Sequence, residues 1–352
     1  MPAAPCECRT KNDFLRETLE KIPGVWYNIV KSLCSELPRT AEIFCECLKK
    51  IMKKNSVKSV LILFSAAFIW GFAFVWQVRC TMPSMWFTSL RFLIGGVVLL
   101  PAAIIFERKK FTDKSLKKKL ILWGAAAGVA LCAASSLQQF GISLSKSSGK
   151  AGFITGTYMV MVPIADAVIA KAKLKAQNII GAVVALGGLF LISFSGGMES
   201  FNIGDVVVFL CAIGWVVQIL IVDRTPGNVP PVSFSIVQYF TCALVSAVIA
   251  LIANGCGWMN GEIMLENLES LLFCGILSSG VAFTAQVIGQ RGCEPGLASI
   301  IMCTESVFAG IGGALLLNEN LGLPGYIGCA LVFAGILIAQ IKDKEQNERT
   351  AN

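Results

Sequence analysis

The stretch KAGFITGTYMVMVPIADAVIAK, residues 150–171, decides the fold class of this chain. Apolar side chains fill most of the interval between its terminal lysines. That interval has the length needed to cross a bilayer, because about 20 helical residues span the roughly 30 Å hydrocarbon core. The stretch nevertheless contains Thr155, Tyr158, Pro163 and Asp166. A membrane helix with such interruptions is expected to face protein or a water-lined cavity, where freed backbone groups find partners.

The composition of the whole chain agrees with a membrane protein. Its 352 residues have a mean hydropathy of +0.70, and 55% are hydrophobic while 15% are charged. This is far more apolar than a soluble domain of the same length. The charged residues gather in 1–58, in 107–119 and from 342 onward, and the stretches between them are almost free of charge. We therefore predict an all-α integral membrane protein.

Ten apolar stretches reach membrane-spanning length. The predicted transmembrane helices cover residues 59–77, 84–106, 120–138, 151–170, 178–195, 204–222, 231–253, 269–289, 296–317 and 324–341. The alternative is eight helices, with two of the stretches lying re-entrant in the membrane.

The distribution of lysine and arginine predicts the orientation, because cytoplasmic loops retain basic residues. With the N-terminus inside, only Arg79, Lys146 and Lys150 of the 30 basic residues fall in outside loops, and Arg91 lies within a span. Both termini are therefore predicted to be cytoplasmic, in a multi-pass protein of the cell membrane. The formal charge of +8 then reflects topology and attraction to anionic lipid headgroups, and nucleic acid is not an expected partner.

The second half of the chain repeats the first at a constant offset. With the halves 147 residues apart, identical residues coincide across three spans: Ile154 with Ile301, Thr157 with Thr304, Gly181 with Gly328, Gly188 with Gly335 and Gln139 with Gln286. Each half contains five predicted spans, an odd number, so the second half must cross the membrane in the opposite sense. We predict two inverted-topology five-helix repeats, 59–195 and 204–341, followed by a cytoplasmic tail at 342–352. Inverted repeats recur in secondary transporters, where a midplane site is exposed alternately to either side.

Several motifs resemble one transporter family. They are WGFAF at 70–74, LRFLIGG at 90–96, the segment 138–193 that begins QQFGISLSKSSGKAGFITG, and GDVVVFLCAIGWVVQILIVDR at 204–224. Together they resemble the EamA family of the drug/metabolite transporter superfamily over about residues 59–341. The resemblance implies ten helices in two EamA repeats, with neither ATP nor a metal.

The resemblance also marks individual residues. It implies that Trp70, Gly71, Arg91 and Glu305 are characteristic positions of the family. The chain departs from the family pattern where Ser306 follows Glu305, since the second repeat usually reads Glu-Pro. The proline kink expected in span nine is therefore missing from the sequence. A second departure is in the first repeat, where Ala172 stands at the position of an acid that the second repeat keeps as Glu319.

Three ionisable side chains lie deep within predicted spans: Arg91, Asp166 and Glu305. A charge at the bilayer centre costs at least about 2.5 kcal/mol, so each needs a partner or a watery cavity. Glu305 aligns with Tyr158 across the repeats, and we predict a substrate or proton site with Glu305 as the acid and Tyr158 facing it. The alternative is an ion pair, with Arg91 as candidate partner, that only holds helices together. For Arg91 we predict a structural ion pair, and for Asp166 local pairing with Lys171.

The remaining predicted substrate-binding residues are polar or aromatic and lie inside spans. Gln139 and Gln286 correspond across the repeats, and their alternative role is interhelical hydrogen bonding. Trp70 and Trp215 correspond at an offset of 145 and lie nearer the middle of their spans than an interfacial tryptophan would. Thr155 completes the set.

Pro163 and four glycines are expected to shape the helices. Pro163 cannot donate a hydrogen bond to the carbonyl of Met159, so span four should bend or loosen there. Gly124 and Gly128 in span three, and Gly152 and Gly156 in span four, are predicted sites of close helix packing.

Residues 1–56 lie outside the resemblance. The sequence TAEIFCECLKKIMKK at 40–54 predicts a basic amphipathic helix on the inner leaflet. The Cys-x-Cys pairs at 6–8 and 45–47 do not have the usual spacing of a zinc site, and the chain contains no histidine. No metal and no cofactor are therefore predicted.

The combined features predict a secondary transporter of small organic metabolites or drugs, with export as the favoured direction. Its partners would be a small-molecule solute and the lipid bilayer, with the proton as candidate coupling ion, whereas the oligomeric state is not predicted. The alternatives are an integral-membrane enzyme and a non-transporting membrane sensor. An enzyme is not expected, because no nucleophile, acid/base or Walker motif is visible.

Overall fold

The computed structural model describes residues 57–107, 114–145, 148–171, 174, 176–193, 202–256, 261–316 and 322–339. The chain divides into two compact units, 1–54 and 55–352, and every described residue belongs to the second unit. All regular secondary structure within these ranges is helical. The predicted amphipathic helix and the Cys-x-Cys pairs near the N-terminus lie outside the described residues.

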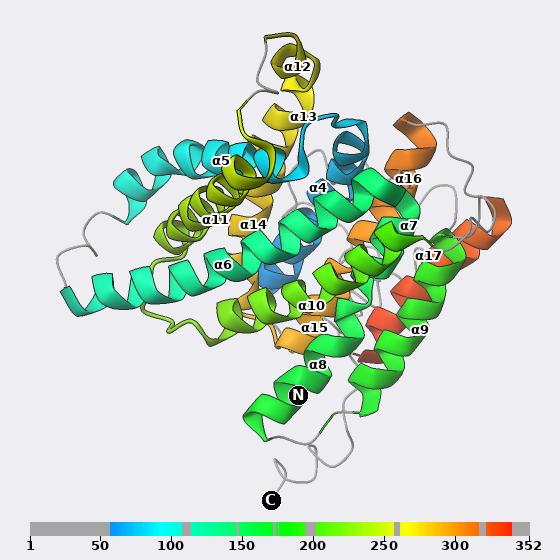
Figure 1. Cartoon of the computed structure of the whole chain (residues 1–352). Helices are drawn as coiled ribbons and strands as arrows, with labels where there is room; N and C mark the ends of the chain where they lie inside the picture. The colour runs from blue at the N-terminus through cyan, green and yellow to red at the C-terminus, as the bar shows by residue number, and fades with distance from the viewer. Residues whose placement is uncertain are drawn as a thin grey trace, which may run out of the picture. The chain divides into compact units, whose positions relative to one another are not determined.

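The helices of the first half cover the predicted spans one to five. They are α4 (Val57–Arg79), α5 (Ser84–Phe106), α6 (Lys114–Ser145), α7 (Ser148–Gly156), α8 (Tyr158–Ala170) and α9 (Ala176–Ser193). Figure 1 shows them in colours from blue to green.

The helices of the second half cover the predicted spans six to ten. They are α10 (Ile203–Arg224), α11 (Pro231–Asn254), α12 (Gly261–Glu266), α13 (Leu268–Leu272), the π-helix η2 (Phe273–Ala282), α14 (Phe283–Gln290), α15 (Pro295–Met302), α16 (Glu305–Leu316) and α17 (Gly322–Ala339). The π-helix has no counterpart in the first half, where the equivalent part of α6 is α-helical.

Eight of the predicted spans are helices, continuous or nearly so, that are long and apolar enough to cross a membrane. The other two, Ala176–Leu191 in α9 and Gly322–Ile336 in α17, are apolar but shorter. The protein is thus an all-α integral membrane protein, with a helix at each of the ten predicted positions and full spanning length at eight of them.

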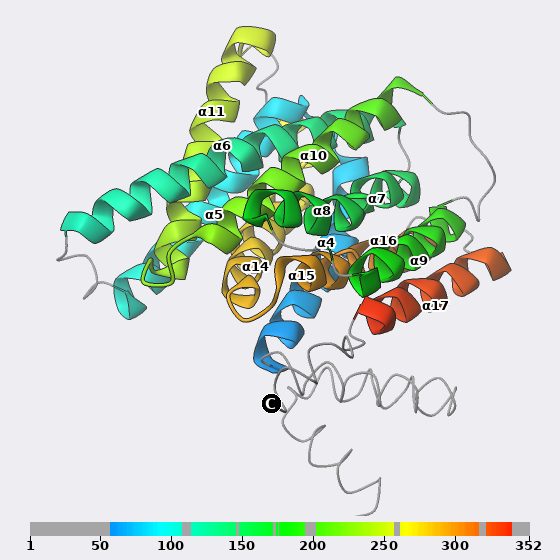
Figure 2. The same cartoon turned by 90° about the horizontal axis from the view of Figure 1, so that it is seen from below.

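The two halves pack with the reciprocity of a two-fold axis. Figures 1 and 2 both show α9 beside α17. In this pair the backbone of Gly181 approaches Gly335, and that of Gly188 approaches Gly328. Since Gly181 corresponds to Gly328 and Gly188 to Gly335, each contact is the image of the other. A Cβ at Gly181 would lie 2.5 Å from the Gly335 carbonyl oxygen, so these glycines are needed for the close approach.

Three of the four glycines predicted to be packing sites, Gly124, Gly128 and Gly156, lie so close to a neighbouring helix that a Cβ would collide, at 2.5 Å from Leu189 for Gly156; a Cβ at Gly152 would make an ordinary contact of 3.4 Å with Ser306. A Cβ at Gly124 or Gly128 would collide with side chains of α11, at 2.7 Å from Val237 and 2.6 Å from Thr241. Gly152 and Gly156 lie opposite Ser306 of α16. The contact between α7 and α16 joins the two repeats.

Spans four and nine are each broken at equivalent threonines. At Thr157, between α7 and α8, the backbone N–H donates to the carbonyl of Ile154 at 3.2 Å and the hydroxyl to the same oxygen at 2.7 Å. Thr304, between α15 and α16, makes the same two bonds to Ile301, at 3.2 and 2.7 Å. These short-range bonds replace the regular helical pattern for one turn.

The prediction for span nine is therefore corrected, whereas the bend predicted at Pro163 stays a prediction. Span four loosens at Thr157, whereas α8 runs through Pro163 without interruption. Span nine is broken although Ser306 stands where the family has proline. The Ser306 hydroxyl instead donates to the carbonyl of Gly152 at 2.8 Å, which ties α16 to α7. The reason is that a threonine hydroxyl can compete for a helical carbonyl without a proline.

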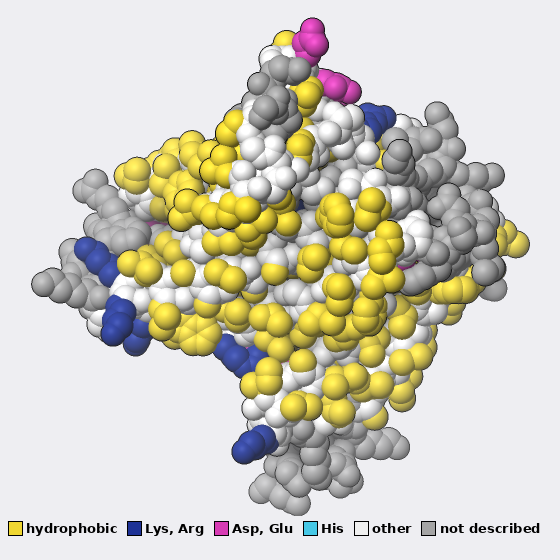
Figure 3. Space-filling view, in the orientation of Figure 1, with side chains coloured by type: hydrophobic (Ala, Val, Ile, Leu, Met, Phe, Trp, Pro, Cys, Tyr) yellow, Lys and Arg dark blue, Asp and Glu magenta, His cyan; other side chains and the backbone are white. Residues whose placement is uncertain are grey.

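The outer surface of the helices is apolar. Figure 3 shows hydrophobic side chains over most of one face, with basic side chains near the free ends of α6 and α8 and acidic ones at α12. Large apolar side chains such as Ile105, Phe106, Leu122 and Val168 are exposed. In water such a surface would be a liability, and it is what a bilayer requires.

Candidate functional site

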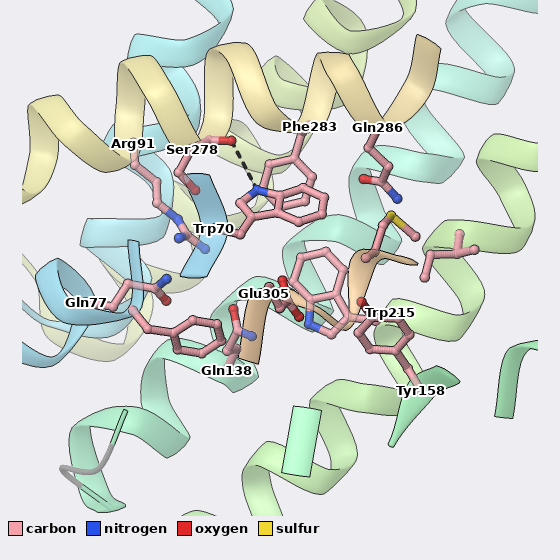
Figure 4. Close-up of a pocket in the computed structure, with 13 residues that line it drawn as sticks. Trp70, Gln77, Arg91, Gln138, Tyr158, Trp215, Ser278, Phe283, Gln286 and Glu305 are labelled. Atoms are coloured by element: carbon pink, nitrogen blue, oxygen red, sulfur yellow. Dashed lines mark hydrogen bonds between the residues drawn. The ribbon is translucent and has the colours of Figure 1, made fainter. Parts of the chain in front are cut away.

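A cavity lies between the two repeats and receives side chains from both. It is lined by Trp70, Phe74 and Gln77 of α4, Arg91 of α5, Gln138 of α6, Tyr158 of α8, Trp215 and Ile219 of α10, Ser278 of η2, Phe283 and Gln286 of α14, Met302 of α15 and Glu305 of α16. Figure 4 draws these lining residues as sticks and labels ten of them.

The helix breaks place Tyr158 and Glu305 in this cavity. Each is the first residue of the helix that follows its break, α8 or α16. Both side chains line the cavity, and both are buried, Glu305 with 6% of its surface exposed. The N-terminal end of α16 carries a partial positive charge that favours a carboxylate at this position. The repeat symmetry thus brings an acid and a phenol into the lining of one cavity.

Two tryptophans flank one phenylalanine in the cavity wall. The Phe283 ring lies 4.6 Å from Trp70 and 5.5 Å from Trp215, measured between ring centroids. The indole N–H of Trp70 donates to the Ser278 carbonyl at 3.3 Å (Figure 4), whereas that of Trp215 has no acceptor. This aromatic surface suits a flat or apolar solute, and its free indole N–H could donate to one.

The structure divides the predicted polar residues into a lining and a supporting layer. Gln286 lines the cavity, but Gln139 and Thr155 do not. Gln139 donates to the backbone carbonyl of Gln77 at 3.1 Å, and Thr155 accepts from the Gln138 amide at 3.3 Å. The two predicted residues therefore hold two lining glutamines, Gln77 and Gln138, that the repeat comparison did not select.

A chain of buried glutamines continues from the cavity toward the end of α14. Gln286 donates to Gln218 at 3.1 Å, and Gln218 donates to Gln238 at 3.5 Å. Gln290 follows one turn after Gln286, and neither of its amide atoms has a partner. Unpartnered buried amides are costly in a dry interior, so this chain is suited to a region that takes up water or solute.

Arg91 also lines the cavity, and only 2% of its surface is exposed. Its guanidinium lies over the rings of Phe92 and Phe87, at 4.9 and 5.5 Å from their centroids. The Nε and Nη2 atoms have no acceptor, and no carboxylate of the described residues forms an ion pair with Arg91. The structural ion pair expected for Arg91 is thus not found in this part of the chain.

Asp166 has a different partner from the one expected. Its carboxylate forms an ion pair with Arg224 at 2.7 Å, joining the end of α8 to the end of α10, rather than pairing with Lys171. Lys171 adopts a left-handed backbone conformation with φ 51°, which ends α8. Asp166 lies outside the cavity lining, so the structure gives it a role in packing.

The described ranges can be compared with the ligand sets that metal sites require. They contain no group of three or more histidine, cysteine, aspartate or glutamate side chains that could hold a metal ion. The nine cysteines described there are all free thiols.

Duplicated halves, helices broken within the membrane and a polar and aromatic cavity between the halves together define a class of protein, the membrane transporters with internal repeats. The chain belongs to the EamA-like transporter family, whose model matches residues 57–194 and 202–340. The two matched segments correspond to the two halves described above.

Similar proteins carry the same general description. An uncharacterized transporter of Archaeoglobus fulgidus is 26% identical over 279 residues, which cover 78% of this chain and 83% of the relative. The uncharacterized transporter YoaV of Bacillus subtilis (strain 168) is 24% identical over 290 residues, covering 80% and 96%. A solved crystal structure with 20% sequence identity matches the fold with a TM-score of 0.64, over 84% of this chain and 99% of that chain.

Proposed function

We propose that this protein is a secondary exporter of small organic metabolites or drugs that works by alternating access. The observation that carries the proposal is the symmetric pair Tyr158 and Glu305. Each follows a helix break, each comes from a different repeat, and both face one cavity. A site held at the interface of two inverted repeats can be exposed to either side when one repeat rocks against the other.

In the proposed mechanism, two sets of contacts between the repeats close the cavity, one toward each predicted face of the membrane. At the predicted outer end, Thr81 and Asn267 exchange two hydrogen bonds of 2.8 Å, and Trp76 stacks on Phe273 with centroids 4.0 Å apart. At the predicted inner end, Asp166 pairs with Arg224. In the proposed cycle each set opens in turn while the other stays closed.

Glu305 is the proposed coupling acid. It is the one carboxylate among the described residues that line the cavity, and a buried carboxyl group is stable either protonated or beside a cation. Glu305 would therefore bind a proton and the solute in alternation. A proton-coupled exporter requires this exchange of proton for solute.

The proposed location is the cell membrane, with both termini in the cytoplasm. Support comes from the charges at the helix ends. Exposed lysines lie at the start of α6 and the end of α8, and exposed acids lie in α12, on the opposite side in the proposed topology (Figure 3). This distribution follows the positive-inside rule.

The direct test is solute flux in proteoliposomes containing the purified full-length protein. Labelled amino acids, nucleosides, polyamines and cationic drugs would be assayed one class at a time, with and without an imposed pH gradient. We expect saturable flux of at least one class, with strong loss in Glu305→Gln. The matched control is Glu269→Gln, which changes an exposed carboxylate away from the cavity.

Two outcomes would count against the proposal. Flux that is equal in Glu305→Gln and wild type would remove Glu305 from the mechanism. Turnover of a lipid headgroup by the purified protein, without flux of any of the four classes, would favour the integral-membrane enzyme instead.

A further inference from the structure

The buried charges of the described residues fall into two kinds. Four charged side chains there are buried: Arg91, Glu107, Asp205 and Glu305. Glu107 accepts three hydrogen bonds at the start of α11, and Asp205 forms a capping box with Asn202 at the start of α10. Both carboxylates are thus used by helix ends. Arg91 and Glu305 remain, and both line the cavity.

The surroundings of Arg91 do not neutralise it. Among the described residues it forms no ion pair with a carboxylate, and thiols such as those of Cys274, Cys242 and Cys80 lie in its surroundings. Its other close neighbours are the rings of Phe87 and Phe92. Attraction to two aromatic faces offsets only part of the cost of removing a guanidinium from water.

The two donors of Arg91 that lack an acceptor lie on one edge of its planar guanidinium group. Nε and Nη2 have no acceptor, and together they form the edge of the guanidinium that binds two oxygens of one oxyanion. Figure 4 shows the Arg91 side chain reaching the cavity on the same side as Gln77 and Ser278, next to Trp70. A ligand there would have an oxyanion at Arg91 and its organic body against the aromatic wall.

We propose that Arg91 is the recognition site for an oxyanion, a carboxylate or a phosphate, on the transported solute. The inference rests on the proposed transport function and narrows its substrate class to organic anions and zwitterions. In a zwitterion, the cationic group would lie toward Glu305, the one acid among the described lining residues. The oxyanion of the solute would then neutralise Arg91, for which the described residues provide no carboxylate partner.

The test measures binding to purified full-length protein by calorimetry, with matched pairs of probes. The pairs are benzoate with benzamide, phenylalanine with phenylalaninamide, phenyl phosphate with phenol, and glucose 6-phosphate with glucose. We expect at least one anionic member to bind about tenfold or more tightly than its neutral partner. The carboxylate and phosphate arms show which oxyanion the site takes.

Three variants separate recognition from folding. In Arg91→Gln the preference for the anion should disappear, through about 10- to 100-fold weaker binding, while the neutral partner binds as before. Arg91→Lys keeps the charge but loses the fork, and an intermediate affinity is expected. Lys58→Gln removes one exposed positive charge at the start of α4 and should bind like wild type. Unchanged binding of the neutral probe shows that the cavity of each variant is folded.

Three results would overturn the proposal. They are an anion preference that survives in Arg91→Gln, the absence of any anion preference in wild type, and binding of chloride with no preference among organic anions. Binding is measured without flux, so the two proposals can fail separately. Arg91-dependent anion binding without transport would contradict the exporter, whereas transport that is equal in Arg91→Gln would contradict only the anion site.

Discussion

Buried carboxylates have different surroundings at the helix ends and in the cavity. Glu107, at the end of α5, is 5% exposed and accepts hydrogen bonds from Val232 N at 3.1 Å, Ser233 N at 2.7 Å and Ser233 Oγ at 2.6 Å. Glu305 is 6% exposed, yet it lies at the cavity, whose lining also includes Tyr158. Burial is the same, and the partners differ.

Two arginines, one at a helix end and one in the cavity, also differ in their hydrogen-bond and ion-pair partners. Arg224, at the end of α10, pairs with Asp166 at 2.7 Å. Arg91 has free donors at Nε and Nη2. The arginines also differ in depth, since Arg224 is 29% exposed and Arg91 is buried. Glu107 and Glu305 are buried alike, and their comparison teaches that the partners of a buried charge, rather than its depth, separate residues that hold helix ends from residues that line the cavity.

Replacing the fully partnered carboxylate should have the largest effect on stability. Glu107→Ala leaves two backbone N–H groups and a hydroxyl at the start of α11 without an acceptor. We expect the free energy of unfolding to fall by about 3 kcal/mol, since hydrogen bonds to a charged group are involved. Denaturant unfolding in mixed micelles measures it, with exposed Glu262→Ala as the control. A decrease in the free energy of unfolding of less than about 1 kcal/mol would show that Glu107 contributes no more to stability than we expect of Glu305.

Replacing the cavity carboxylate should change function rather than stability. Glu305→Gln removes a charge that no described cation pairs with, so the free energy of unfolding should stay within about 1 kcal/mol of wild type or rise. Solute flux should fall about 10- to 100-fold, the equivalent of a lost charge-assisted hydrogen bond. The pH dependence of the remaining flux should also flatten. A variant that unfolds as readily as Glu107→Ala would place Glu305 among the structural charges.

An unpartnered amide should behave differently from both carboxylates. In Gln290→Leu, a buried side chain with no hydrogen bond is replaced by an apolar one of similar size. Because no partner is left unsatisfied, we expect unchanged or higher stability, by up to about 1 kcal/mol. Flux should decrease if this glutamine chain is part of the solute path. Gln139→Leu is the matched comparison, since Gln139 donates to the Gln77 carbonyl and its loss should destabilise the protein.

The smallest effect is expected at the ion pair between α8 and α10. The side chains of Arg224 and Asp166 are 29% and 32% exposed, and pairs this accessible to solvent contribute little to stability. Asp166→Asn should lower the free energy of unfolding by less than about 1 kcal/mol, measured by the same denaturant titration. The double exchange Asp166→Arg with Arg224→Asp should recover most of that loss. A loss as large as that of Glu107→Ala would show that this pair is not screened.

Much of the fold could be predicted because it depends on local composition. The span lengths, the duplication and the inverted sense follow from apolar runs, a constant offset and an odd number of spans per half. Long runs of apolar side chains have one stable arrangement in a bilayer, which is a helix with its backbone hydrogen bonds satisfied internally. The helix breaks were harder to predict from the sequence. Proline at 163 is a stronger indicator of a break than threonine at 157, because the effect of a threonine depends on which carbonyl its hydroxyl group bonds.

The site was predictable only where the repeat symmetry pointed to it. Matching the halves selected Tyr158 with Glu305, and Trp70 with Trp215, and the structure places all four in the cavity lining. Residues without an image in the other repeat, such as Phe283 and Ser278, gave no such signal. Ser278 belongs to the π-helix, an asymmetric feature that a comparison of two halves cannot reveal.

The amino-acid sequence by itself determined that this chain crosses the membrane repeatedly, that its halves are inverted copies and which family it resembles. These properties reside in hydrophobicity and repetition, which are read along the chain. Only the tertiary structure decided which charges have partners. In the structure Asp166 pairs with Arg224, and Gln139 and Thr155 lie behind the cavity wall. The Nε and Nη2 atoms of Arg91 have no acceptor. The physical reason is that a charge is neutralised by atoms a few ångströms away, and in a helical bundle those atoms come from residues far apart in the sequence.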